Sequence, residues 1–116
     1  MEYRNLGSSG LKVSALGLGG NTFGWYIDEQ GTAAVINKAL DSGINFVDTA
    51  DMYDKGRSEE FVGRALKGKR LQVLLASKFS FAMGESPNER GASRWYIPRA
   101  VEAVLQVLST LSGEPP

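Results

Sequence analysis

"NFVDTADMYDKGRSEEFVG", residues 45–63, begins as an apolar strand and ends as the start of a helix. Residues 44–48 form a short apolar run that closes on Asp48, which is typical of a β-strand ending at an acidic residue. Ser58 is followed by two glutamates and then by apolar residues at helical spacing, so we expect Ser58 to cap an α-helix. The stretch therefore predicts a strand–loop–helix unit with Tyr53 in the loop.

Similar units lie on either side of this one. Upstream, residues 15–19 predict a short strand, and Asp28 is suited to cap a helix that ends near Gly43. Downstream, residues 72–77 form a near-continuous apolar run that ends at Lys78. A run of this kind favours a strand that is buried on both faces, as in a parallel sheet.

Two further elements complete the expected order. Residues 2–6 and 11–14 flank the turn sequence GSSG and predict an N-terminal hairpin. Residues 79–92 predict a long polar loop, after which a helix starts at Ser93 or Tyr96. Strands that alternate with helices predict an α/β fold with parallel strands and right-handed crossovers. Because an eight-stranded barrel needs roughly 250 residues, the chain is either a small open sheet or the first part of a barrel.

Composition excludes several functional classes. The chain has 116 residues, with 13 Lys+Arg and 13 Asp+Glu, so a zero formal net charge gives no reason to expect nucleic-acid binding. Cysteine and histidine are both absent, so we expect no metal site, and acid–base chemistry has to use Asp, Glu, Lys or Tyr. No apolar run approaches the ~20 residues that cross a bilayer, and the start does not resemble a signal peptide. We therefore expect a cytoplasmic protein.

The residues best suited to catalysis lie at the ends of the predicted strands 44–48 and 72–77. Asp48 ends one strand, Lys78 follows the next, and Tyr53 lies just after the first of them, so all three should gather at the carboxyl edge of the sheet. An ammonium beside a phenol stabilises the phenolate, and a carboxylate holds the ammonium in place. Such a tyrosine can donate a proton to a carbonyl oxygen as negative charge develops there. Taken singly, each residue has an ordinary alternative: a turn-capping Asp, a solvated Lys and a packing Tyr.

The glycine-rich segment after the first predicted strand is not a dinucleotide fingerprint. Gly17 and Gly19 fit the G-x-G spacing, but Thr22 stands at the third position and no helix follows directly. A loop with Gly20 and Asn21 could still let a flat ring approach the backbone, although a plain tight turn explains it equally well.

Three stretches together resemble the N-terminal part of the aldo-keto reductase family: "YRNLGSSGLKVSALGLGGNTFG", "GINFVDTADMYDKGRSEEFVGRAL" and "LLASKFS". The resemblance runs from residue 1 to about 110, and implies a (β/α)8 TIM-barrel oxidoreductase that uses NADPH to reduce a small-molecule aldehyde or ketone. It implies catalytic roles for Asp48, Tyr53 and Lys78, with Tyr53 as proton donor, and places Gly20, Asn21 and Asp48 at the cofactor.

The sequence also departs from that family. A histidine is expected at the end of a fourth strand, and the chain contains neither histidine nor a recognisable fourth strand. We therefore expect residues 1–116 to form a partial domain, an N-terminal β-hairpin plus the first three βα units, truncated and with impaired activity. The alternative is a non-catalytic fragment or interaction module that pairs with itself or another chain through its open sheet edge, and a marginally folded remnant is a further alternative.

Overall fold

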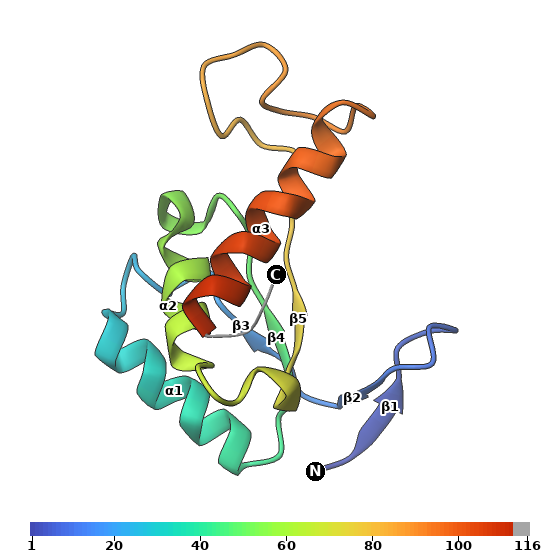
Figure 1. Ribbon diagram of the computed structural model, residues 1–116. Helices are drawn as coiled ribbons and strands as arrows, with labels where there is room; N and C mark the ends of the chain where they lie inside the picture. The colour runs from blue at the N-terminus through green and yellow to red at the C-terminus, as the bar shows by residue number, and fades with distance from the viewer. Residues whose placement is uncertain (113–116) are drawn as a thin grey trace.

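The N-terminal hairpin stands apart from the helical part of the molecule. The computed structural model describes residues 1–112, with side chains described to residue 109. Strands β1 (Tyr3–Asn5) and β2 (Lys12–Ser14) pair antiparallel, as the turn sequence predicts (Figure 1). The Tyr3 hydroxyl donates a hydrogen bond to the Gly43 carbonyl at 2.8 Å, which attaches the hairpin to the turn after the first helix.

A three-stranded parallel sheet forms the centre of the fold. Its strands are β3 (Leu18–Gly19), β4 (Phe46–Asp48) and β5 (Leu74–Ala76), in the order β3-β4-β5. The register places Gly19 opposite Asp48, and Asp48 opposite Ala76, so the carboxyl ends of all three strands lie at one edge. The predicted α/β class and parallel order are confirmed, and over residues 1–112 the sheet is open and does not close into a barrel.

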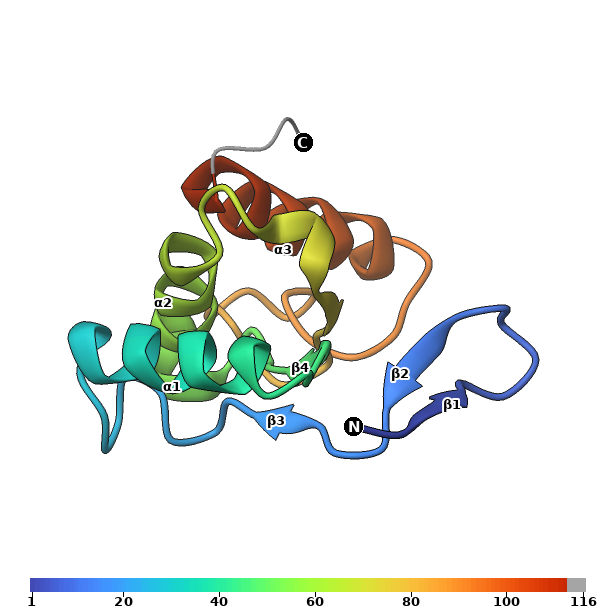
Figure 2. The same cartoon turned by 90° about the horizontal axis from the view of Figure 1, so that it is seen from below.

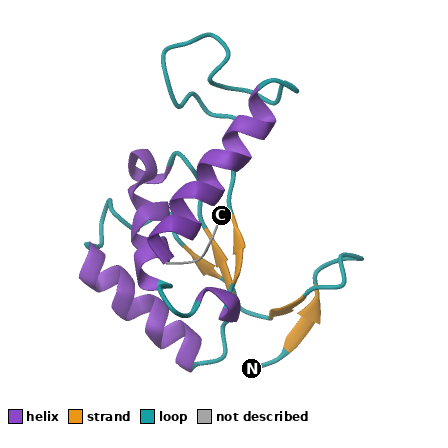
Figure 3. Ribbon diagram, viewed as in Figure 1, coloured by secondary structure: helices purple, strands orange, loops and turns teal. Residues whose placement is uncertain are grey.

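Three helices cover one face of this sheet. They are α1 (Glu29–Asp41), α2 (Arg57–Ala65) and α3 (Tyr96–Ser112), and α2 lies between the other two (Figures 2 and 3). Asp28 caps α1 as predicted, because its Oδ1 accepts a hydrogen bond from the Gly31 amide at 2.7 Å. No helix within residues 1–112 has the length and apolar character that a membrane crossing requires.

The prediction that Ser58 caps α2 is wrong. The helix begins at Arg57, directly after Gly56, whose φ of 98° lies in the left-handed region. A short 3-10 turn over Tyr53–Gly56 leads into the helix, which moves the N-cap two residues upstream of Ser58. The Ser58 side chain is instead buried inside the helix and forms tertiary hydrogen bonds.

The sheet and the inner faces of the helices share one apolar core. It consists of the buried side chains Phe23, Ile36, Val47, Val62, Leu66, Val73 and Leu108. The prediction that β5 is buried on both faces is wrong, because all three of its residues are half-buried. Within the described residues β5 has a strand neighbour on one side only, so its apolar residues keep contact with solvent. On α3, Val101 and Leu105 are each 47% exposed.

Candidate active site

The structure brings Lys78, Asp48 and Tyr53 together at the carboxyl edge of the sheet. The Lys78 ammonium donates hydrogen bonds to Asp48 Oδ2 at 2.7 Å and to the Tyr53 hydroxyl oxygen at 3.0 Å. It donates a third to the backbone carbonyl of Thr49 at 3.0 Å. An ammonium has three N–H donors, so this set uses all of them and holds the lysine in one orientation.

Backbone hydrogen bonds beyond the strand ends create this convergence. The Thr49 amide donates to the Ala76 carbonyl at 2.8 Å, and the Asp51 amide donates to the Lys78 carbonyl at 3.2 Å. These bonds carry the pairing of β4 and β5 past the last residues of both strands. Lys78 therefore leaves β5 alongside the segment that follows Asp48, within reach of its carboxylate.

The loop that carries Tyr53 has an unusual backbone. Asp54 and Lys55 have φ values of 46° and 56°, a left-handed conformation that non-glycine residues seldom adopt. Each such residue costs on the order of 1–3 kcal/mol unless its surroundings impose it, and strain of this kind is concentrated at functional sites. The Tyr53 amide donates to the Ala50 carbonyl at 3.3 Å, which helps to start this turn with the phenol facing Lys78.

The electrostatics of the site favour a charged lysine. Partial burial acts to lower the pKa of Lys78, but the hydrogen bonds to Asp48 and Tyr53 and the charges of these groups outweigh it, so the pKa of Lys78 is raised. The Lys78 and Asp48 side chains are 48% and 42% exposed, and exposed ion pairs contribute little to stability. The ion pair therefore contributes little to the stability of the fold.

This geometry is suited to general acid chemistry at Tyr53. The phenolic oxygen accepts from Lys78, so its own proton remains available for a second group. If that proton passes to a carbonyl oxygen, the resulting phenolate stays hydrogen-bonded to an ammonium. Because all the Lys78 donors are occupied within the chain, the Tyr53 hydroxyl is the group of this cluster that keeps a free proton to donate.

Gly20 and Asn21 lie in the loop after β3, next to the same edge. The Gly20 amide donates to the Asp48 carbonyl at 2.7 Å, and its carbonyl accepts from the Ser58 hydroxyl at 2.8 Å. A Cβ at Gly20 would lie 3.0 Å from the Asp48 carbonyl oxygen, so the close approach of two chain segments requires glycine there. Both polar backbone groups of Gly20 are used within the chain, whereas Asn21 is exposed. Of these two residues, Asn21 is therefore the one whose polar side chain is accessible at this edge.

Sequence reasoning missed two buried carboxyl groups behind this edge. Asp51 and Glu59 are only 8% and 4% exposed. Burial raises the pKa of each carboxyl, against a hydrogen bond from the Met52 backbone to Asp51 and one from the Ser77 hydroxyl to Glu59. In the sequence, Glu59 has the features of an ordinary first-turn acid, and no local signal marks Asp51, because both contact segments that are distant along the chain.

The hairpin, the open parallel sheet and the lysine-supported tyrosine define an α/β fold with a candidate site at the carboxyl edge of its sheet. A sequence model of the aldo/keto reductase family matches residues 15–112, most of the chain. The chain belongs to the aldo/keto reductase family, as the sequence motifs predict.

Individual relatives agree with this assignment. The chain is 40% identical over 116 residues to aldo-keto reductase YhdN of Bacillus subtilis, covering 95% of this chain and 35% of that protein. It is 38% identical over 112 residues to a probable voltage-gated potassium channel subunit beta of Arabidopsis thaliana, covering 93% and 34%. The solved structure of aldo-keto reductase AKR11C1 from Bacillus halodurans, in its holo form, matches with a TM-score of 0.80 and 41% identity, covering 93% and 36%. The chain spans about a third of the length of these relatives.

Proposed function

We propose that this chain carries the proton-donating part of an NADPH-dependent reductase that converts an aldehyde or ketone to an alcohol. Family membership supports oxidoreductase chemistry. The observation that carries the proposal is the 3.0 Å hydrogen bond from Lys78 to the Tyr53 hydroxyl. The other two donors of the same ammonium group bind Asp48 and the Thr49 carbonyl.

Each residue has a distinct role in this reaction. A nicotinamide bound at this edge would supply the hydride to the carbonyl carbon. Tyr53 donates its proton to the carbonyl oxygen as negative charge develops there, and the phenolate that remains is stabilised by the Lys78 ammonium. Asp48 orients Lys78 through its hydrogen bond and helps to keep it charged, because this contact raises the pKa of the lysine.

The cofactor side of the site is proposed for Gly20, Asn21 and Asp48. Gly20 brings the loop after β3 against the Asp48 carbonyl, which places the exposed Asn21 beside the edge where Tyr53 and Lys78 meet. The choice of NADPH over NADH and the cytoplasmic location are part of the same proposal. A chain without cysteine suits a reducing compartment.

Exchange of Tyr53 for phenylalanine tests this role. With NADPH and a small aromatic aldehyde, we expect Tyr53→Phe to lower the turnover rate by ~10²–10⁴-fold, the usual contribution of a general acid. NADPH binding, followed by its fluorescence, should stay within about twofold of wild type, because the phenol contributes to proton transfer and not to cofactor affinity. Tyr26→Phe is the matched control, since Tyr26 is 77% exposed and stacks on Trp25. An unchanged rate in Tyr53→Phe would remove Tyr53 from the proton-transfer step.

An interaction module remains the second candidate function. The half-buried β5 and the exposed Val101 and Leu105 on α3 leave apolar surface that a second chain could cover. Light scattering after size exclusion distinguishes the two candidates. A dimer without turnover favours assembly, and a monomer across the accessible concentration range excludes self-association as the function.

A further inference from the structure

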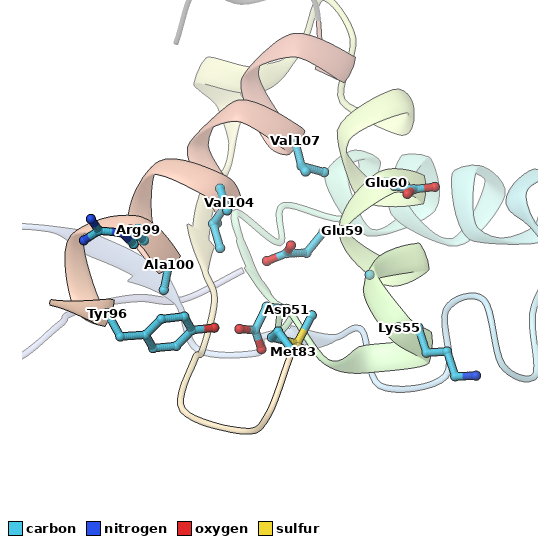
Figure 4. Close-up of a pocket in the computed structure, with 12 residues that line it drawn as sticks. Asp51, Lys55, Glu59, Glu60, Met83, Tyr96, Arg99, Ala100, Val104 and Val107 are labelled. Atoms are coloured by element: carbon cyan, nitrogen blue, oxygen red, sulfur yellow. The ribbon is translucent and has the colours of Figure 1, made fainter. Parts of the chain in front are cut away.

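A cavity of about 280 Å³ lies between α2 and α3, on the helical side of the Tyr53 loop (Figure 4). Much of its α3 wall is aliphatic, formed by Ala100, Ala103, Val104 and Val107, and Met83 from the long loop adds to it. Its polar end is formed by Asp51 and Glu59, and Tyr96 points its hydroxyl toward Asp51 (Figure 4). Apolar walls thus lead to Asp51 and Glu59, while Glu60, which also lines the cavity, pairs with Arg64.

One carboxyl oxygen at this end, Asp51 Oδ1, lacks a hydrogen-bond partner. Asp51 is more than nine-tenths buried, and its Oδ1 is a buried atom without a hydrogen-bond partner among the described residues. Glu59 accepts one hydrogen bond, from the Ser77 hydroxyl at 2.6 Å. Buried polar atoms are nearly always paired, so an unpartnered carboxylate oxygen beside a cavity indicates a missing donor.

The cationic side chains that line the cavity do not supply this donor. Arg99 stacks on the Trp95 ring at 3.8 Å and donates to the Trp95 carbonyl at 2.6 Å, away from both carboxyl groups. Lys55 directs its ammonium away from the cavity (Figure 4). Among side chains to residue 109, no lysine or arginine forms an ion pair with Asp51 or Glu59.

We propose that this cavity binds a small primary alkylammonium ion, whose ammonium group sits between Asp51 and Glu59 and whose alkyl chain lies against α3. An ammonium has three donors, and the polar end offers three acceptors in Asp51, Glu59 and the Tyr96 hydroxyl. A molecule of water occupies about 30 Å³ in the liquid, so the cavity holds roughly nine non-hydrogen atoms.

A metal ion fits this site less well than an amine. Within the described residues, no group of three or more acidic, cysteine or histidine side chains is placed to hold a metal. Calcium takes six to eight oxygen ligands, and the aliphatic α3 wall offers none. An organic cation uses both the carboxyl groups and the apolar wall.

The inference is independent of the proposed reductase function. The Asp51 amide donates to the Lys78 carbonyl at 3.2 Å, so the same residue contacts the active-site edge through its backbone and the cavity through its side chain. The cavity can be occupied whether or not Tyr53 transfers a proton.

Titration of the full chain with hexylammonium chloride, followed by amide NMR shifts, tests the proposal. We expect saturable shifts confined to residues that line the cavity, with 1-hexanol, the neutral probe of equal chain length, binding at least tenfold more weakly. Asp51→Asn should weaken hexylammonium binding at least tenfold, whereas Glu102→Gln, an exposed change on α3 outside the cavity, should leave it within twofold.

Two results would overturn the proposal. One is equal binding of hexanol and hexylammonium by the wild-type chain, which would show that the carboxyl groups play no part. The other is the absence of saturable shifts at millimolar probe. Because the comparison of two probes uses the unaltered chain, the test does not depend on how well Asp51→Asn folds.

Discussion

Removal of the Ser58 hydroxyl should destabilise the fold more than a serine on a helix usually does. Ser58 and Thr49 are fully buried, and their hydroxyl oxygens lie 2.8 Å apart. Ser58 also donates to the Gly20 carbonyl at 2.8 Å, which joins α2 to the loop after β3. Ser58→Ala leaves the buried Thr49 hydroxyl without this partner, so we expect a loss of about 1–3 kcal/mol in the free energy of unfolding.

A second substitution identifies the source of this loss. The Gly20 carbonyl also accepts from the Phe23 amide at 3.1 Å, so the stranded group in Ser58→Ala is chiefly the Thr49 hydroxyl. Thr49→Val replaces that hydroxyl with a methyl group of similar shape. We therefore expect the double variant to be at least as stable as Ser58→Ala alone. The sum of the two single losses in the free energy of unfolding should exceed the loss in the double variant by about 0.5–3 kcal/mol.

Urea unfolding measured by circular dichroism supplies all the values. Ser42→Ala is the matched control, because Ser42 is exposed and its hydroxyl bonds only within its own helix turn, so its effect should stay within about 0.5 kcal/mol. A Ser58→Ala variant that unfolds at the wild-type midpoint with the same slope would show that the buried Thr49–Ser58 hydrogen bond does not stabilise the fold. So would a double variant that loses the full sum of the single losses.

Three further predictions concern the site and its surroundings. Gly20→Ala should cost about 1–3 kcal/mol in urea unfolding, because its Cβ meets a β4 backbone oxygen at 3.0 Å, while Gly19→Ala, with nothing within 4 Å, should cost less than half as much. Because the pKa values of Asp51 and Glu59 are raised in the folded chain, their contribution to stability is complete below the ordinary carboxyl pKa of about 4 and is lost as pH rises through the raised values. The urea midpoint should therefore fall over this pH range, and the fall should be smaller in Glu59→Gln. Lys78→Met should abolish the turnover that depends on the phenol yet change stability by less than about 1 kcal/mol, because the ion pair is exposed; a large stability loss would contradict its assignment to chemistry.

Much of the fold follows from local signals in the sequence. Asp28 and Gly43 bound the first helix because capping and a left-handed turn depend on a few neighbouring residues, and Gly43 has a φ of 89°. The meeting of Asp48 and Lys78 also follows, since parallel strands place their carboxyl ends at one edge. The distance between the two residues along the chain does not matter once the strands are in register.

Features that depend on packing between distant segments did not follow from the sequence. Ser58 has the local features of a helix cap, yet Gly20 and Thr49 lie where its hydroxyl bonds across the core. Asp51 resembles a surface turn residue, yet it is buried and lines a cavity whose other wall is α3. A buried polar group is identified by its partners, and those partners come from elsewhere in the chain.

If Asp48 and Tyr53 orient Lys78, both should affect the pKa of its ammonium group. Selective ¹³C labelling at lysine Cε allows this pKa to be followed by NMR in the wild-type chain and in Asp48→Asn and Tyr53→Phe. The hydrogen bonds and charges of both partners raise the pKa, so it should exceed the ordinary lysine value of about 10.4 in the wild type and fall in each variant. A Lys78 titration that is identical in all three chains would contradict the account.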